Sequence, residues 1–423
     1  MTDAPVAPWF HRPKPLPQGA AIAVVGGGVG GCAAAWALRR AGFAVTLIDR
    51  AGHVAAEASG NPCGLLKPRL TADGGLHGRF YGRAYLHAVE TLDRVGGWLG
   101  RGILSVARDA DEAATMARLA GTLPPDHIAL VDAAGARAVA GVDAPLGGLW
   151  FPKAGSIDPR AVCAALAAGV EMRGAAVSSL ISDAAGWRLL DEAGRVVVEA
   201  EAVVLAAGPW TPRLWPVAEL PIHAKRGQIT LLPGLPDGPS AAVSFGGYLS
   251  PPVADGKHVL GATYERIADL DDPAWRTVRP EDDAANLALL ADALPELRTR
   301  WPEGQIDGRR VSLRATIADH LPVMGPLFDA SAWRTAYGDL HHGRAWRSYP
   351  EAPLTEGLFV LGGLGSRGFQ TAPLLAEALA ALIAGTPLPT GQDLWEAVHP
   401  GRFVLRALRR PPARTARGAS SIA

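Results

Sequence analysis

The sequence predicts an α/β protein in which a Rossmann-like domain is interrupted by an inserted antiparallel-β domain. Two observations predict this. Alternating strand and helix patterns occur at the beginning, the middle and the end of the 423 residues, whereas residues 221–264 contain short strands broken by Gly and Pro. A chain of this length has room for two domains. The simplest arrangement is one domain built from three separated segments, with β-rich segments between them.

Composition restricts the function classes. Hydrophobic residues make up 48% of the chain and charged residues 19%, as in a globular enzyme rather than a disordered protein. Lys and Arg together number 41, as do Asp and Glu, so a polyanionic partner must bind a local patch. Cys32, Cys63 and Cys163 lack the spacing of a disulfide framework or a zinc site, which favours a cytoplasmic location. Glycines interrupt the uncharged run at residues 20–38, so we expect no targeting or membrane segment.

The first strand–helix–strand unit carries a nucleotide-binding pattern. Its three elements are expected at residues 21–25, 29–41 and 44–49. Gly26, Gly28 and Gly31 form G-x-G-x-x-G after the first strand, where glycine allows a tight turn and the close approach of a pyrophosphate. Asp49 ends the second strand, where a carboxylate can hold a ribose hydroxyl. We expect a dinucleotide here, and the motif alone does not distinguish FAD from NAD.

Further elements follow along the chain. Asp158 and Pro159 are typical of a helix N-terminus, with a capping side chain followed by proline. Other elements are expected at residues 77–95, 195–208, 280–294 and 357–363 and in the Ala/Leu-rich segment after them. We assign residues 20–95, 150–215 and 352–395 to the nucleotide-binding domain, and 96–149 and 216–351 to a substrate domain. Residues 1–19 form a linker-like lead-in, and residues 396–423 form a basic tail in which arginines and no acid follow Glu396.

Several motifs, in order, resemble the D-amino-acid oxidase/glycine oxidase family of flavoenzymes. Beside the glycine turn they are GVEMRGAAV, AVVLAAGPWT, KRGQ (225–228), GGYLSPP, GATYE and LRATIADHLPVMGP. Other stretches are closer still to the FAD domain of the bifunctional bacterial enzymes that modify the tRNA wobble uridine: EASGNPCGLLKP (57–68), DLHHGR (339–344), and GLGSRGFQTAPLLAEALA with HPGRFVLRALRR. APWFHRP (7–13) is similar to the linker of those enzymes. We expect no counterpart of their methyltransferase domain in this chain.

The resemblance implies FAD as a non-covalent cofactor. The residues implied to contact it are Gly26, Gly28, Gly31, Asp49, Ser59, Gly60, Asn61, Val177, Gly208, Gly365, Ser366, Arg367, Gly368, Phe369 and Gln370. SRGFQT (366–371) would bring backbone N–H groups, a helix N-terminus and Arg367 to the pyrimidine edge of the flavin, where reduction places negative charge. The alternative is an ordinary capped helix with a solvated arginine.

The resemblance also implies a substrate site. Arg314 matches the position that binds a substrate carboxylate, a role that suits a guanidinium because its fixed fork contacts both oxygens. Tyr248 is implied to line the same pocket and to hydrogen-bond that carboxylate. The alternatives are a surface ion pair for Arg314 and a core tyrosine with a satisfied hydroxyl for Tyr248. Lys67 and Arg69 either contact substrate or RNA or are solvated.

By this resemblance, the predicted reaction is FAD-dependent oxidation of the carboxymethylaminomethyl group on tRNA wobble uridine. Its expected products are glyoxylate and aminomethyluridine, with tRNA as partner, molecular oxygen as acceptor, and neither membrane nor metal involved. His341 and His342 favour loop packing over a metal site, because no third ligand is evident. Two alternatives stay open: a glycine/sarcosine-type oxidase of small molecules, and a non-catalytic FAD protein that binds RNA. The tail either neutralises RNA phosphates or is a solvated terminus.

Overall fold

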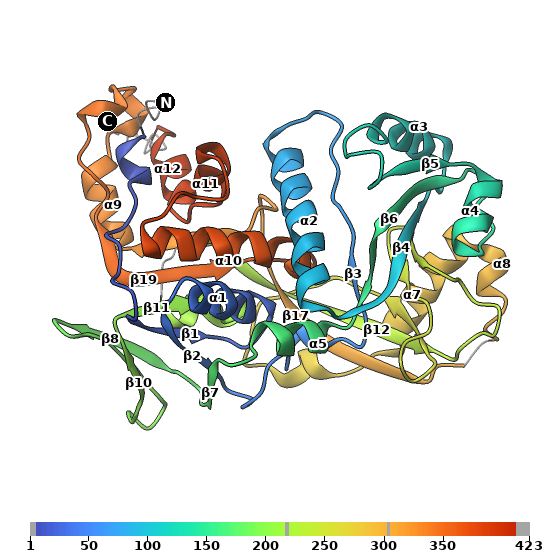
Figure 1. Cartoon of the computed structure of the whole chain (residues 1–423), viewed down its shortest axis with the longest axis horizontal. Helices are drawn as coiled ribbons and strands as arrows, with labels where there is room; N and C mark the ends of the chain where they lie inside the picture. Colours follow the sequence, from blue (N-terminus) through green and yellow to red (C-terminus); the bar gives the residue numbers. More distant parts are fainter. Residues whose placement is uncertain (1–5, 216–219, 303–304, 412–423) are drawn as a thin grey trace, which may run out of the picture.

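The computed structural model describes residues 6–215, 220–302 and 305–411, and its α/β fold confirms the predicted class (Figure 1). Six of the described strands form one sheet in the order β18-β19-β11-β1-β2-β7. They are β1 (Ala21–Val25), β2 (Ala44–Asp49), β7 (Glu171–Gly174), β11 (Ala202–Leu205), β18 (Val323–Phe328) and β19 (Leu354–Gly362). Every neighbouring pair is parallel except β18 with β19. The carboxyl ends of the parallel strands therefore lie at one edge of the sheet.

Helices that pack closely together cover this sheet. α1 (Val29–Arg40) and α10 (Gly368–Ala384) lie side by side, and α2 (Leu76–Val95) and α5 (Pro159–Leu166) adjoin them (Figure 1). α10 is apolar around its whole circumference and is accordingly buried along almost its full length. The predicted start of α5 is confirmed, because the Asp158 side chain accepts hydrogen bonds from the backbone N–H groups of Arg160 and Ala161.

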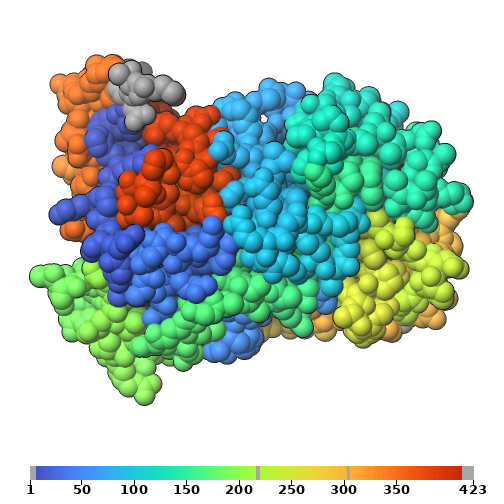
Figure 2. All heavy atoms as spheres, in the orientation of Figure 1, coloured from blue at the N-terminus to red at the C-terminus, as the bar shows by residue number. Residues whose placement is uncertain are grey.

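Ten of the described strands form a second, mixed sheet. Its path is β16-β12-β15-β14-β13-β4-β6-β3, with β17 paired to β12 and β5 paired to β6. The strands are β3 (Gly64–Leu66), β4 (Trp98–Val106), β5 (Ala129–Val131), β6 (Gly148–Ile157), β12 (Ile222–Leu232), β13 (Ala242–Ser244), β14 (Tyr248–Leu249), β15 (His258–Gly261), β16 (Glu265–Ile267) and β17 (Gly308–Ile317). The accompanying helices are α3 (Ala110–Leu119), α4 (Ala133–Ala140), α7 (Pro280–Ala293) and α8 (Pro295–Arg298). In Figure 2 the blue and red ends of the chain gather on one side, and teal and yellow atoms on the other.

Smaller elements complete the fold. β8 (Ser179–Asp183), β9 (Gly186–Leu190) and β10 (Val196–Ala200) form an antiparallel sheet that projects beside β7 (Figure 1). The remaining α-helices are α6 (Thr211–Leu214), α9 (Ala330–Tyr337), α11 (Gln392–Val398) and α12 (Arg402–Leu408). The short 3-10 helices are η1 (Pro8–Phe10), η2 (Ala58–Gly60), η3 (Gly208–Trp210), η4 (Pro273–Arg276), η5 (Leu340–His342) and η6 (Trp346–Ser348). The two ends of the described chain meet, because Trp9 is buried and the Arg409 guanidinium lies 5.6 Å from its ring centroid.

Three strands belong to a different sheet from the one that the expected domain boundaries imply. β3 and most of β6 fall in segments assigned to the nucleotide-binding domain, yet both strands belong to the ten-stranded sheet. β18 falls in the expected substrate domain, yet it pairs with β19 in the six-stranded sheet. All six residues of β18 are buried, and such a run has the same sequence pattern in either sheet. No helix in the described part of the chain is long and apolar enough to cross a membrane.

Candidate functional site

A cavity of about 1140 Å³ lies at the carboxyl edge of the parallel sheet. Its wall contains the segments that directly follow β1, β2, β7, β11 and β19, together with residues of the ten-stranded sheet. Segments far apart in the sequence meet here because parallel strands of an open α/β sheet present their carboxyl ends at one edge. The volume exceeds the roughly 300–1,000 Å³ of typical small-molecule pockets. The cavity therefore has room for a dinucleotide together with a substrate.

The glycine-rich turn is built as the G-x-G-x-x-G pattern predicts. Gly26 has a φ of 115°, and a Cβ there would lie 2.5 Å from the carbonyl oxygen of Ala206. At Gly28 a Cβ would meet the Ser59 hydroxyl at 3.4 Å and nothing closer, so its backbone is accessible from the cavity. At Gly31 a Cβ would lie 1.8 Å from the Gly26 carbonyl oxygen, so this glycine packs helix against turn and does not line the cavity.

Two side chains fix the backbone of this turn. The Asp49 Oδ2 atom, at the end of β2, accepts a hydrogen bond from the Gly27 N–H at 2.7 Å. The Ser59 Oγ atom accepts one from the Val29 N–H, in the first turn of α1, at 2.9 Å. Both side chains also line the cavity. The acid that sequence analysis assigned to a ribose is therefore held in place by the glycine-rich turn itself.

Two arginines hold the loop that contains Ser59. Arg310, on β17, donates from Nη1 to the Asn61 Oδ1 atom at 2.5 Å and from Nη2 to the Glu57 carbonyl oxygen at 2.6 Å. Arg160, on α5, donates to the Gly60 carbonyl oxygen at 2.8 Å. A Cβ at Gly60 would lie 2.1 Å from a backbone oxygen of the loop, so Gly60 serves the turn and does not line the cavity. Burial, with the nearby Arg160 charge, lowers the pKa of Arg310.

The first turn of α10 brings positive charge into the cavity wall. Arg367 immediately precedes α10, and its Nη1 atom donates to the Lys67 carbonyl oxygen at 3.5 Å. The Lys67 Nζ atom donates to the hydroxyls of Ser244 at 2.8 Å and Ser105 at 3.1 Å. Burial, with the Arg69 charge, lowers the pKa of Arg367. Burial, with the Arg367 charge, lowers the pKa of Lys67 to about 7.

Arg314 on β17 and Tyr248 on β14 line the same cavity. The Arg314 guanidinium lies 5.3 Å from the ring centroid of Tyr264, and its Nη1 atom donates to the Thr263 carbonyl oxygen at 3.4 Å. Gly227, on β12, leaves space for this side chain, because a Cβ there would lie 2.2 Å from Arg314 Nη1. Burial raises the pKa of Tyr248 far above its usual value, so its hydroxyl stays protonated at neutral pH.

Further contacts join these groups into one cluster. Ser244, which holds Lys67, is the cross-strand partner of Tyr248. The Ser366 hydroxyl donates to the Tyr264 hydroxyl at 3.4 Å. The structure thus brings the sequence motifs around residues 57–68, 244–248, 264, 314 and 366–367 together at one region of the cavity wall.

The cavity wall has unpaired positive charge. Two of its acids are paired, Glu57 with Arg50 at 2.6 Å and Asp271 with Arg213 at 2.7 Å. Its cations without an acidic partner among the described residues are Lys67, Arg276, Arg314 and Arg367. Guanidinium and ammonium groups held in a partly dry cavity bind carboxylates and other anions strongly. The cluster is therefore suited to an anionic ligand group.

Most residues implied to contact the cofactor line this cavity: Gly26, Gly28, Asp49, Ser59, Asn61, Val177, Gly208, Gly365, Ser366, Arg367, Gly368 and Phe369. Gln370 does not, because its side-chain amide turns into the core and donates to the Tyr81 carbonyl oxygen at 2.9 Å. Sequence reasoning did not single out Ser244, Tyr264 or Arg310. Tyr264 could have been found from its place in the GATYE motif, whereas no local sequence pattern marks Ser244 or Arg310.

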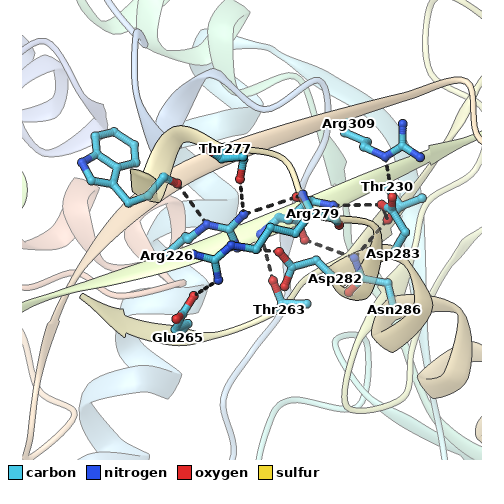
Figure 3. Close-up of polar contacts among 12 residues, drawn as sticks. Arg226, Thr230, Thr263, Glu265, Thr277, Arg279, Asp282, Asp283, Asn286 and Arg309 are labelled. Carbon is cyan, nitrogen blue, oxygen red and sulfur yellow. Dashed lines mark hydrogen bonds and ion pairs between the residues drawn. The ribbon is translucent and has the colours of Figure 1, made fainter. Parts of the chain in front are cut away.

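The KRGQ motif fixes β12 through the polar contacts of Arg226 drawn in Figure 3. Arg226 is fully buried, pairs with Asp282 at 2.5 Å and donates to the carbonyl oxygens of Trp275 and Thr277. Gln228 donates to the carboxylate of Asp283 at 3.0 Å. These bonds attach β12 to α7 and to the segment before it. The motif is structural, and it supports the strand that carries Gly227.

Other candidate residues lie away from the cavity. The rings of His341 and His342 are 4.0 Å apart, and the described residues contain no group of three His, Cys, Asp or Glu side chains that could hold a metal. Arg402, in the basic tail, is buried and pairs with Asp319 through bonds of 3.0 and 3.1 Å. This arginine is structural rather than solvated or bound to RNA. Residues 412–423 of the tail lie outside the described part of the chain.

Comparison with known proteins gives close relatives in sequence. The chain matches the family model "DAO: FAD dependent oxidoreductase" over residues 21–382. A Magnetococcus marinus protein named "tRNA 5-methylaminomethyl-2-thiouridine biosynthesis bifunctional protein MnmC" is 40% identical over 420 residues, which cover 96% of this chain and 63% of that protein. The protein of the same name from Pseudomonas aeruginosa is 37% identical over 95% of this chain and 62% of its own length. The chain thus spans less than two thirds of these relatives.

Solved structures of lower sequence identity share the fold. Glycine oxidase from Geobacillus kaustophilus superposes with a TM-score of 0.68 at 21% identity, covering 89% of this chain and 98% of that chain. L-proline dehydrogenase from P. horikoshii superposes with a TM-score of 0.70 at 20% identity, covering 92% of this chain and 98% of that chain. Both similarities extend over the six-stranded and the ten-stranded sheets together, since so little of the chain is left uncovered.

Proposed function

The chain belongs to the family of FAD-dependent oxidoreductases, and on this premise we propose that it oxidises the carboxymethylaminomethyl group of tRNA wobble uridine. The reaction releases glyoxylate and leaves aminomethyluridine on the tRNA. The observation that carries the proposal is the cluster of unpaired cations, with Arg314 and Tyr248, in the wall of the nucleotide-binding cavity. The name of the relatives at 37–40% identity supports tRNA as the substrate.

FAD is the cofactor of this family, and the cavity fits it. The backbone at Gly28 is accessible from the cavity, and Asp49 is fixed beside it, as a pyrophosphate and a ribose require. When bound, FAD supplies the oxidising chemistry by accepting hydride from a substrate carbon. The start of α10 and Arg367 would face the edge of the flavin where negative charge develops. Cys63 lines the cavity, but burial raises the pKa of its thiol to about 12, so the thiol stays protonated and unreactive, which supports non-covalent binding of FAD.

The substrate group is a secondary amine that carries a carboxylate on its reacting carbon. Arg314 would bind both carboxylate oxygens, and the protonated Tyr248 hydroxyl would donate to one of them. Two such contacts fix the orientation of the CH₂ group, so that one C–H bond points at the cofactor. Loss of the hydride from carbon and of the proton from nitrogen turns the existing C–N bond into a C=N bond, and water adds to this imine and releases glyoxylate from the aminomethyl group. Arg314 thus acts by positioning.

The proposal includes molecular oxygen as the electron acceptor and tRNA as the partner. Most of a tRNA lies outside the cavity, so contacts remote from the reacting carbon can supply the binding energy that orients it. A tRNA substrate also places the protein in the cytoplasm. A small-molecule glycine/sarcosine oxidase would need the same cofactor and the same carboxylate anchor, and it differs only in lacking the remote contacts.

Nucleoside mass spectrometry of tRNA before and after incubation tests the proposal. tRNA that bears carboxymethylaminomethyluridine should lose this nucleoside, gain aminomethyluridine and release an equal amount of glyoxylate. A protein that turns over free glycine or sarcosine but leaves the tRNA unchanged is a small-amine oxidase. A protein that binds FAD and tRNA but oxidises neither kind of substrate is a non-catalytic binder. Either result contradicts the proposal.

A further inference from the structure

We propose that Lys225 and Arg266, which continue a row of cations outward from the carboxylate anchor Arg314, bind the RNA phosphates next to the reacting nucleotide. The row consists of Arg266 on β16, Lys225 on β12 and Arg314 on β17. It starts in the cavity, because Arg314 belongs to the cavity wall, and it ends at the exposed Arg266 on the edge of the sheet. The inference rests on the proposed function, since it names the surface that would hold the tRNA around the oxidised group.

The strand register places the three side chains on one face. Lys225 lies directly opposite Arg266 in the β12–β16 pair and directly opposite Arg314 in the β12–β17 pair. Directly opposed residues in antiparallel strands point to the same face, and neighbouring strands lie about 4.8 Å apart. The row therefore extends roughly 10 Å across the sheet. The residues on either side of Lys225 in β12 are buried, so Lys225 points away from them, to the more accessible side of the strand.

This face keeps its positive charge uncompensated. Like charges directly opposite each other in a sheet are destabilising, so such a row has a cost that the fold alone does not explain. None of the three cations forms an ion pair with an acid in residues 6–215, 220–302 and 305–411. The neighbouring acid, Glu265, lies on the other face and pairs with Arg279 at 2.8 Å (Figure 3).

The pKa of a histidine beside the row is affected by the positive charge of the row. His223 lies two residues from Lys225 on β12, and its Nδ1 atom is 3.2 Å from the Arg266 guanidinium. Burial lowers the pKa of His223, and the charges of Arg266 and Lys225 lower it further. The ring is therefore neutral at physiological pH and leaves the row as the source of positive charge on this face.

An exposed aromatic side chain favours RNA as the occupant. Tyr264 is 48% exposed and also lines the cavity. The Lys225 Nζ atom lies 4.6 Å from its ring centroid, and the Arg314 guanidinium lies 5.3 Å from it. An aromatic ring among unpaired cations is the combination that binds single-stranded nucleic acid, through base stacking and phosphate contacts. The wobble nucleotide lies in a single-stranded loop, so the row fits its flanking phosphates.

The test compares Lys225→Gln, Arg266→Gln and the double variant with wild type, each loaded with FAD. The matched control is Arg118→Gln, which removes an exposed arginine from α3, a helix that packs on β6. Two substrates are used, modified tRNA and the free carboxymethylaminomethyluridine nucleoside, at several salt concentrations. For the double variant, we expect kcat/KM for tRNA relative to nucleoside to fall about tenfold, and the salt dependence of tRNA binding to lose about 0.7 per removed contact. The control should match wild type in both measurements.

An unchanged tRNA-to-nucleoside ratio and an unchanged salt slope in the double variant would overturn the inference while leaving the proposed function intact. An equal loss in the Arg118→Gln control would also overturn it, since any surface cation would then suffice. If wild-type protein oxidises the nucleoside and does not bind tRNA, both the RNA-binding row and the tRNA substrate are excluded. If it binds tRNA through the row and oxidises neither substrate, the row stands and the proposed reaction fails.

Discussion

Replacing Gly227 by alanine tests whether the position of Arg314 controls the reaction. The added Cβ would lie 2.2 Å from Arg314 Nη1 and 2.7 Å from the Thr263 carbonyl oxygen. Ordinary contact begins at 3.4 Å, so the guanidinium must move by about 1 Å, and the backbone oxygen prevents an easy retreat of the new methyl group. A displacement of about 1 Å in a group that orients a substrate can cost roughly 10²-fold in rate, or about 2.7 kcal/mol. We therefore expect the rate of flavin reduction by the bound substrate to fall about 10²-fold.

The assay follows anaerobic bleaching of the flavin by modified tRNA in single turnovers. Bound FAD and the melting temperature are measured in parallel, to separate loss of positioning from loss of fold. Gly121→Ala serves as the control, because a Cβ at Gly121 would meet no atom within 4 Å. A Gly227→Ala protein that retains FAD and bleaches as fast as wild type would refute the view that Arg314 is held in a required position.

Three further predictions follow from individual side chains. Arg314→Lys keeps the charge but loses the two-pronged grip, so flavin reduction should slow by about 10²-fold with an unchanged flavin spectrum, and wild-type reduction kinetics would contradict this. Because burial lowers the pKa of Lys67 from 10.5 to about 7, the folded protein binds fewer protons than the unfolded chain between these values, and its stability rises with pH across that window. Lys67→Met should therefore raise the melting temperature most at pH 7 and progressively less towards pH 10, whereas a pH-independent gain would contradict the buried-charge explanation. Arg402→Met removes two charged hydrogen bonds from the partly buried Asp319 and leaves it with Arg406 at 3.3 Å, so urea denaturation should show a loss of about 1.5–3 kcal/mol, and a loss well below about 1 kcal/mol would show that the Arg402 pair behaves as a surface pair.

Sequence patterns predict the parts of this molecule that local physics determines. Gly26 has a positive φ, which favours glycine, and the Asp158 side chain caps α5 by accepting hydrogen bonds from backbone N–H groups two and three residues further on. Both features involve only residues that are close in sequence, so the local pattern was enough to predict them. The candidate cofactor residues also follow from topology. They stand directly after parallel strands, and such positions meet at one edge of the sheet.

The remaining features depend on contacts between distant segments. Gly227 is required because any side chain there would overlap with Arg314 on the neighbouring strand. Arg310 holds the loop of Glu57 and Asn61, which lies in the other half of the chain. The arginines of the tail seemed equivalent in the sequence, yet Arg402 is buried because Asp319 lies beside it. Cross-strand register likewise aligns Arg266, Lys225 and Arg314, which no local pattern indicates.

The proposed substrate of this flavoenzyme is a glycine-like group attached to tRNA. The most direct measurement is anaerobic reduction of the bound flavin, followed by its absorbance, with modified tRNA, free glycine and sarcosine compared at equal concentrations. We expect rapid bleaching by tRNA that bears carboxymethylaminomethyluridine, far slower bleaching by glycine and sarcosine, and none by unmodified tRNA. Rapid bleaching by sarcosine together with none by the modified tRNA would contradict the proposed tRNA substrate and assign the protein to the small-amine oxidases.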